Sequence, residues 1–255
     1  MIGRGGALAA LVAAALLLSG CTAAASAVQT PTPVATPTPE PIAAGDGSLR
    51  VATVLDMVGS GAAVSQAQVA GVQLAVRELN EQGGVLGAPV VVLHRSTATD
   101  ASALAGELED RAIDVVLWAA TGDIPEEIAA LGDATTVARI GPADWKPDEA
   151  FAARLKSADP GASSLAGGGE AYDTTMRVAL AATVADNDSG SAVAAGITTV
   201  SSGSFSCVSF GECAAALADD ATISYAGVTG SGGLAQATPE AEPTPAKTPA
   251  KTKKK

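Results

Sequence analysis

Aromatic residues are scarce in this 255-residue chain, at 3% of the composition, and 15 Lys and Arg stand against 27 Asp and Glu. The charge imbalance is greatest in the middle, because residues 48–233 hold nine basic and 23 acidic side chains. Proteins that bind nucleic acid stack bases on aromatic rings and neutralise phosphates with Lys and Arg. The sequence therefore argues against a nucleic-acid partner.

Residues that carry catalytic or metal chemistry are also few. The chain has one histidine, His94, and contains no phosphate-binding loop, no CxxC motif and no His-rich cluster. The run from Asp186 to Gly190 is similar to the start of a calcium loop, but its Gly comes one place early and Ile197 takes the position of the final Glu. We therefore expect no enzymatic activity, no cofactor and no bound metal, and we interpret His94 as a structural residue.

The N-terminus predicts export and lipid attachment. Twelve apolar residues, 7–18, suit a signal-peptide core but not a finished membrane span, which needs about 20 residues. The run ends in Leu18-Ser19-Gly20-Cys21, which resembles the signal of bacterial lipoproteins, in which the Cys thiol receives a diacylglycerol before cleavage. We predict a signal peptide over residues 1–20 and an acylated Cys21 on the outer face of the bacterial cytoplasmic membrane. An ordinary secretory signal followed by a chance Cys is the alternative.

Two cysteines, Cys207 and Cys213, remain once Cys21 is assigned to the lipid anchor. An even pair in an exported chain predicts a disulfide, since compartments outside the cytoplasm are oxidising. Two free buried thiols are the alternative interpretation.

Low-complexity segments flank the middle of the chain. Residues 21–47 are rich in Thr and Pro, and Pro favours an extended linker because it removes backbone donors. Residues 234–255 repeat this composition and end in a Lys-rich stretch without apolar periodicity, so we predict a disordered tail. The lysines could bind an anionic wall polymer or lipid, or serve only for solubility.

Apolar strands alternate with helices between these segments. Strands are predicted at residues 49–55, 89–94, 113–118 and 136–140, with helices at 65–82, 100–111 and 125–131. Repeated β-α units with continuous apolar strands indicate an α/β fold, a three-layer sandwich in which helices cover both faces of a parallel sheet. The second half predicts mainly helices, at 148–156, 171–185, 190–200 and 213–218, and one strand at 223–225.

Two stretches of the sequence resemble one transporter family. The first runs from Leu49 to Gly87 and ends in Leu79-Asn80-Glu81-Gln82-Gly83-Gly84-Val85-Leu86-Gly87. The second contains Glu170-Ala171-Tyr172-Asp173-Thr174-Thr175 and residues 223–230. These residues look like the periplasmic solute-binding proteins of branched-chain amino acid (leucine/isoleucine/valine) ABC transporters, which have the type I fold. The resemblance covers most of residues 48–233.

The chain departs from the family pattern because it lacks a second lobe. Family members have two α/β lobes and hold the ligand between them. Here the units of the first lobe run to about Ile140, and the segment from Trp145 already resembles the part that returns to that lobe. The intervening residues leave room only for a short connection. We therefore predict one lobe over residues 48–233, whose sheet contains strands from both halves of the sequence.

The resemblance implies ligand contacts in the loops after the first and third strands. It places Ser60 and Gly61 in the first loop, Thr121 in the second and Tyr172 in the returning segment. Hydroxyl and backbone N–H groups at helix starts suit a carboxylate, whereas Asp144 after the fourth strand would repel one. The competing interpretation is that Ser60 and Thr121 are only turn and cap residues.

Two functions fit these observations. One is a lipid-anchored solute-binding component that binds a small amino-acid-like ligand for an ABC permease, weakly, because a half-site stays open to water. The other is an interaction module that has lost solute binding and contacts a separate protein or a cell-wall polymer. Both place the chain at the membrane through its lipid anchor.

Overall fold

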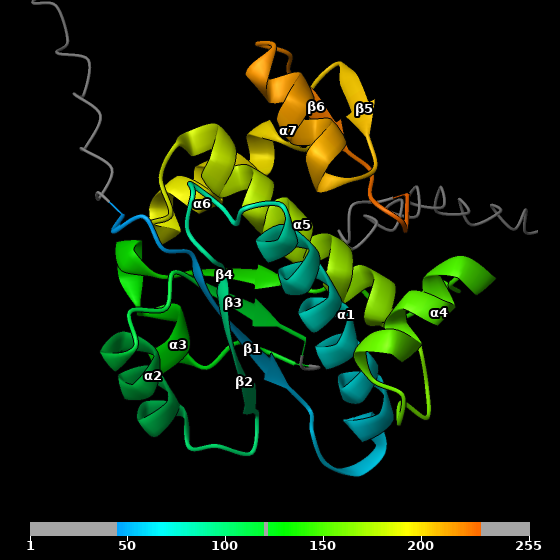
Figure 1. The fold of residues 1–255 in the computed structure, drawn as a ribbon. Helices are drawn as coiled ribbons and strands as arrows, with labels where there is room; N and C mark the ends of the chain where they lie inside the picture. The colour runs from blue at the N-terminus through cyan, green and yellow to red at the C-terminus, as the bar shows by residue number, and fades with distance from the viewer. Residues whose placement is uncertain (1–44, 120–121, 231–255) are drawn as a thin grey trace, which may run out of the picture. The chain divides into compact units, whose positions relative to one another are not determined.

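Four parallel strands form the centre of the chain (Figure 1). The computed structural model describes residues 45–119 and 122–230; the predicted signal peptide, Cys21, most of the linker, Thr121 and the tail from residue 231 lie outside them. The strands, which follow the order β2-β1-β3-β4, are β1 (Arg50–Leu55), β2 (Val91–Ser96), β3 (Val115–Trp118) and β4 (Thr136–Arg139). The four strands predicted from the apolar runs of the first half are confirmed.

The helices of the described residues also follow the predicted pattern. They are α1 (Ala62–Glu81), α2 (Ala101–Asp110), α3 (Glu126–Ala129), α4 (Glu149–Ala158), α5 (Gly168–Ala185), α6 (Gly190–Thr199) and α7 (Phe210–Ala218). Two begin at an Asp that caps the helix: Asp100 accepts from Ala103 N at 3.0 Å, and Asp148 accepts from Phe151 N at 2.8 Å. Within residues 45–119 and 122–230, no helix has the length and apolar character needed to cross a membrane.

Helices cover both faces of the sheet (Figure 1). Alternate residues of β1 point to opposite sides, as the pleat of a strand requires. Val51 and Leu55 belong to the core beneath α1 and α5, whereas Ala52 and Val54 pack with buried residues of α2 and α3. The predicted fold class, a three-layer α/β sandwich that forms one lobe, is confirmed.

Helix α5 joins the second half of the sequence to the first. Fifteen of its 18 residues are buried, because it packs against both α1 and α6. The approach to α1 depends on Gly71, where a Cβ would overlap the carbonyl oxygen of Gly168. Only residues 140–148 connect β4 to α4, so the part of the chain that the structure describes has no second lobe at this point.

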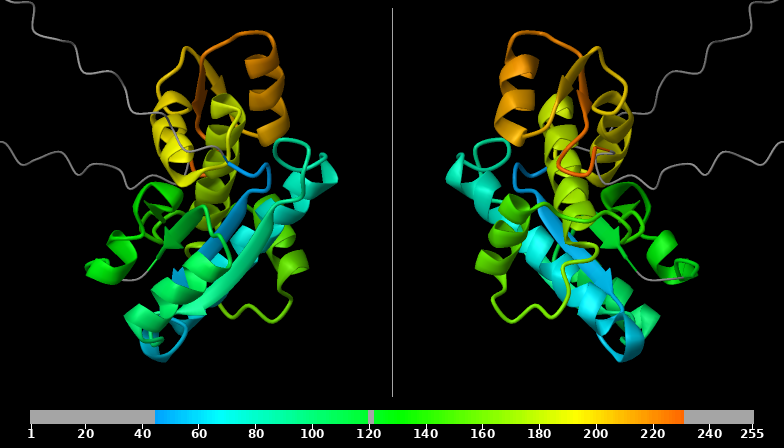
Figure 2. Two further views of the ribbon diagram at one scale, coloured as in Figure 1. Left: turned by 90° about the vertical axis from the view of Figure 1, so that its left-hand side faces the viewer. Right: turned by 90° about the vertical axis from the view of Figure 1, so that its right-hand side faces the viewer.

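The prediction that strands from both halves share one sheet is wrong. The last two strands, β5 (Phe205–Cys207) and β6 (Ile223–Tyr225), form a separate parallel pair, and α5 lies between this pair and the four-stranded sheet (Figures 1 and 2). The start of α6 packs against the start of β4, where a Cβ at Gly190 would come within 2.7 Å of backbone atoms of Ala134, Thr135 and Thr136. The two short strands β5 and β6 therefore pair with each other and do not join the main sheet.

The predicted disulfide is present within this smaller unit. Cys207 ends β5, Cys213 lies in α7, and the two Cα atoms are 5.4 Å apart. Both cysteines are fully buried. The disulfide therefore fixes α7 to the small pair of strands.

Acidic side chains hold the segment that leads into β1. Asp188 accepts hydrogen bonds from Gly47 N at 3.2 Å and Ser48 N at 2.7 Å, and Asp114 accepts from Arg50 N at 2.7 Å. Burial, with a smaller contribution from the charge of Asp188, raises the pKa of Asp114 to about 7. The entry of the chain into the lobe is thus fixed by carboxylates from distant parts of the sequence.

Candidate functional site

The strand order reverses between β1 and β3. The chain leaves β1 towards β2 on one side and returns to β3 on the other, so the loops that follow β1 and β3 diverge at the carboxyl ends of the strands. In open parallel sheets, ligands bind at the carboxyl edge where the order reverses. We call this region, formed by residues 56–61 after β1 and the loop that begins at Ala119 after β3, the switch-point edge.

The β1–α1 loop is fixed by hydrogen bonds around Asp56. Ser65 Oγ donates to the Asp56 carbonyl at 2.9 Å, and Thr97 Oγ1, which follows β2, donates to Asp56 Oδ1 at 2.7 Å. Gly61 lies so close that a Cβ there would come within 2.9 Å of Asp56 Cβ. The sequence prediction gave Gly61 a ligand contact, and the structure adds a packing reason for glycine at this position.

Ser60 and Gly61 lie together at the switch-point edge, in the 3-10 turn Gly59–Gly61 that leads into α1. Ser60 is exposed, and its hydroxyl has no hydrogen-bond partner among the described residues. The 20-residue helix α1 has no acidic residue in its first turn and no side-chain cap. The N–H of Ala62, the first residue of α1, donates to the Gly59 carbonyl. The positive end of the helix dipole still favours an anion at this point.

Strand β4 ends in a cation, not predicted from the sequence, that contacts the loop after β3. Arg139 is the last residue of β4, and its Nη2 donates to the Gly122 carbonyl at 3.1 Å. Gly122 directly follows Thr121, which lies outside the described residues. An Arg that ends an otherwise apolar strand was the available signal, since the carboxyl end of β4 lies beside that of β3. Its register with Trp118 places Arg139 on the face of the sheet that α2 and α3 cover, whereas α1 lies on the other face.

Acidic groups lie on the β4 side of this edge. Asp144 is exposed, whereas Glu170 in the first turn of α5 is buried and accepts from Trp145 N at 2.9 Å through Oε1. The other oxygen, Oε2, has no hydrogen-bond partner within residues 45–119 and 122–230. Burial, assisted by the charges of Asp144 and Asp173, raises the pKa of Glu170. These acids disfavour a ligand carboxylate on the α5 side of the edge.

Tyr172 lies inside the helical layer and not at the switch-point edge. Its hydroxyl donates to Glu78 Oε2 at 2.7 Å and accepts a hydrogen bond from Arg154 Nη2 at 3.0 Å. Phe151 packs edge-on against its ring. Burial raises the pKa of the Tyr172 hydroxyl, and the Glu78 carboxylate raises it further. These contacts give Tyr172 a role in joining α5 to α1 and α4, and we leave it out of the ligand set proposed below.

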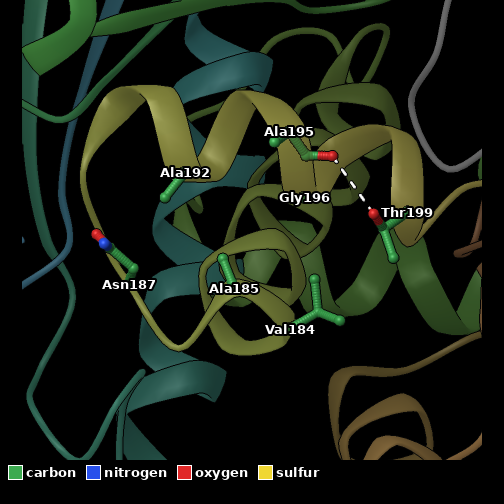
Figure 3. Close-up of a pocket in the computed structure, with 7 residues that line it drawn as sticks. All are labelled: Val184, Ala185, Asn187, Ala192, Ala195, Gly196 and Thr199. Carbon is green, nitrogen blue, oxygen red and sulfur yellow. Dashed lines mark hydrogen bonds between the residues drawn. The ribbon is translucent and has the colours of Figure 1, made fainter. Parts of the chain in front are cut away.

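A cavity of about 260 Å³ lies elsewhere, between the end of α5 and α6 (Figure 3). Its lining is small and mostly apolar, and Thr199 Oγ1 already donates to the Ala195 carbonyl at 3.4 Å. The lining residues are Val184, Ala185, Asn187, Ala192, Ala195, Gly196 and Thr199. None of them carries a charge that could fix an amino-acid-like ligand, and the described residues contain no group of three His, Cys, Asp or Glu arranged for a metal ion.

Comparisons with known proteins find similarity to solved structures. No protein-family model matches the chain, and no curated protein matches it. The branched-chain amino acid transporter substrate-binding protein LivJ from Streptococcus pneumoniae, in complex with isoleucine, is 20% identical over 36% of this chain and 28% of its own length, with a TM-score of 0.28. A fatty acid ABC transporter substrate-binding protein from Thermomonospora curvata is 17% identical over 41% of this chain and 30% of its own length, with a TM-score of 0.26.

The chain thus matches less than a third of the length of either protein. The fold assignment rests on the strand order and packing described above. The ligands of those two proteins are not transferred to this chain by similarity of this degree.

Proposed function

We propose that this chain is a lipid-anchored, non-enzymatic lipoprotein on the outer face of the bacterial cytoplasmic membrane, which binds a small amino-acid-like solute weakly at the switch-point edge. The observation that carries the proposal is the reversal of strand order between β1 and β3, with Ser60 and the uncapped start of α1 at that point. An amino-acid carboxylate would lie against the start of α1, beside Ser60 and Gly61.

The proposed location draws on two features of the chain. The Leu18-Ser19-Gly20-Cys21 sequence favours acylation of Cys21, and the Cys207–Cys213 disulfide supports an oxidising compartment. A non-enzymatic role agrees with the position of His94, whose Nδ1 shares a hydrogen bond with Thr53 Oγ1 in the middle of the sheet, away from the switch-point edge.

Weak binding follows from the open edge. Ligand sites normally remove most of the ligand surface from water, and the short β4–α4 connection provides no second wall here. The same observation favours a second candidate function, in which the edge contacts a separate chain, such as an ABC permease or another binding partner, that covers it. The Lys-rich tail offers a further route to a cell-wall polymer.

An NMR titration tests the proposed function. Isoleucine added to residues 22–255 should shift the amide signals of Gly59–Gly61, with saturation in the millimolar range. Ser60→Ala should weaken binding, whereas Ser202→Ala, at an exposed hydroxyl on another part of the lobe, should leave it unchanged. If no amino acid shifts these signals, solute binding at this edge is excluded and the interaction module stands in its place.

A further inference from the structure

A hollow of about 340 Å³ opens at the amino ends of β1 and β2, at the opposite edge of the sheet from the switch-point edge. Its lining consists of Arg50, Val91, Val92, Leu93, Arg111 and Ile113. Val91 is 51% exposed, although it is a large apolar residue at the start of a strand. The volume lies within the range of small-molecule sites. The hollow thus combines an apolar floor with two guanidinium groups.

Both arginines keep unused donors. Arg50 Nη1 donates to Asp46 Oδ2 at 2.8 Å, and Arg111 Nε donates to Glu107 Oε1 at 2.9 Å. Within the described ranges, Arg50 Nη2 and both η nitrogens of Arg111 have no hydrogen-bond partner. A guanidinium group can therefore donate to a further anion without losing its present contact.

Three acidic side chains near the hollow accept hydrogen bonds from its arginines or from the backbone. Asp46 accepts from Arg50, Glu107 accepts from both Arg95 and Arg111, and Asp114 accepts from Arg50 N. The lining itself contains two arginines and no acid, so an added ammonium group would meet guanidinium groups of like charge. An apolar chain with a single negative end fits the lining better than a zwitterion.

We propose that this hollow binds a small monocarboxylate whose apolar chain lies on Val91, Val92, Leu93 and Ile113 and whose carboxylate meets Arg111 and Arg50. Chain contact with Val91 would remove an exposed valine from water. The site is separate from the switch-point edge, so it does not depend on the solute-binding function proposed above.

The test is an NMR titration of residues 22–255 with 4-methylpentanoate, compared with the uncharged 4-methylpentan-1-ol and with leucine, which adds an ammonium group to the same chain. The acid should give saturable amide shifts at Val91–Leu93 and bind at least about fivefold more tightly than either comparison ligand. Equal binding of the alcohol, or the absence of saturable shifts at Val91–Leu93, overturns the proposal. Shifts confined to Gly59–Gly61 also overturn it, because they place the acid at the switch-point edge.

Three variants complete the experiment. Arg111→Gln should weaken binding of the acid up to about fivefold, because one exposed charge pair is lost while Glu107 keeps Arg95. Val91→Asp should abolish binding, and its 51% exposure means that the fold tolerates a polar side chain there. Arg77→Gln, an exposed arginine on α1 bonded to Ser157, is the matched control and should bind as the parent does. Unchanged affinity in Arg111→Gln would remove the arginine from the site and refute the proposal.

Discussion

Asp173 fastens the last described segment of the chain to α5, and its removal should destabilise the lobe strongly. The side chain is fully buried and accepts four hydrogen bonds. The donors are Tyr225 Oη at 2.9 Å, Val228 N at 2.9 Å, Thr229 N at 2.8 Å and Thr229 Oγ1 at 2.6 Å. A Cβ at Gly227, where φ is +65°, would overlap the same carboxylate, so this turn is built around it.

A buried cation depends on the same carboxylate. Arg177, one helical turn further along α5, is 3% exposed, and its Nε and Nη2 lack partners among the described residues. Burial lowers the pKa of Arg177 to about 10, and the charge of Asp173 opposes this shift. Asp173→Ala therefore removes an acceptor from several donors and a countercharge from a buried guanidinium. Breaking a buried charge network in this way costs about 3–5 kcal/mol, a large part of the 5–15 kcal/mol that keeps a typical domain folded.

The assay is urea unfolding of residues 22–255, followed by tryptophan fluorescence and circular dichroism together. Asp173→Ala should lose about 3–5 kcal/mol, and Asp173→Asn, which keeps one acceptor oxygen but no charge, should lose less. Asp219→Ala, at an exposed acid after α7, is the control and should stay within about 0.5 kcal/mol of the parent. A loss below about 1 kcal/mol for Asp173→Ala would show that the carboxylate does not hold this segment, and would refute the reasoning.

Three further outcomes are expected. Burial raises the pKa of Asp114 from 3.8 to about 7, so the folded state favours the protonated carboxyl group. The contribution of this group to the free energy of unfolding is therefore complete below about pH 4 and is lost as the pH rises through about 7. Asp114→Asn should flatten the stability curve between pH 4 and 7 in urea titrations, and an unchanged slope would contradict the shift. Joint replacement of Cys207 and Cys213 by Ser should lower the unfolding free energy by about 2 kcal/mol, whereas equal stability with and without the disulfide would count against it. Cys21→Ala should leave the protein unprocessed or release it from membranes on cell fractionation, and normal attachment of this variant would end the lipoprotein hypothesis.

The sequence predicts those parts of the fold that depend on local pattern. Continuous apolar runs marked β1 to β4, and Asp100 and Asp148 marked helix starts, because strand burial and capping depend on a few neighbouring residues. The resemblance placed Ser60 and Gly61 in the loop after the first strand, and the structure has them in the turn between β1 and α1. Their contact with a ligand stays a prediction.

Long-range pairings could not be predicted in this way. The partners of Asp173 lie 52 to 56 residues away, and nothing in their spacing distinguishes them from other Tyr and Thr residues. The resemblance gave Tyr172 a ligand contact, but its hydroxyl donates a hydrogen bond to the carboxylate of Glu78, which lies 94 residues earlier in the chain. The separate pairing of β5 with β6 could not be predicted, because α5 lies between these strands and the main sheet. The burial of α5 on two sides depends on tertiary packing, and the spacing of its apolar residues does not reveal it.

The open edge sets the scale of binding that this lobe can achieve. A micromolar dissociation constant corresponds to a binding free energy of about −8 kcal/mol. If two walls contribute equally, one wall alone supplies about −4 kcal/mol, which corresponds to a millimolar dissociation constant. The wall present here is well defined, since Asp56 is fixed by Thr97 and Ser65, and Arg139 is fixed on Gly122. Ordering these loops would therefore cost little of the binding free energy. If a separate chain covered this edge, it would raise the affinity for the solute, and the solute would raise the affinity for that chain by the same factor. The two proposed functions would then be two aspects of one site. Solute binding would be weak for the lobe alone and strong only together with a partner that supplies the second wall.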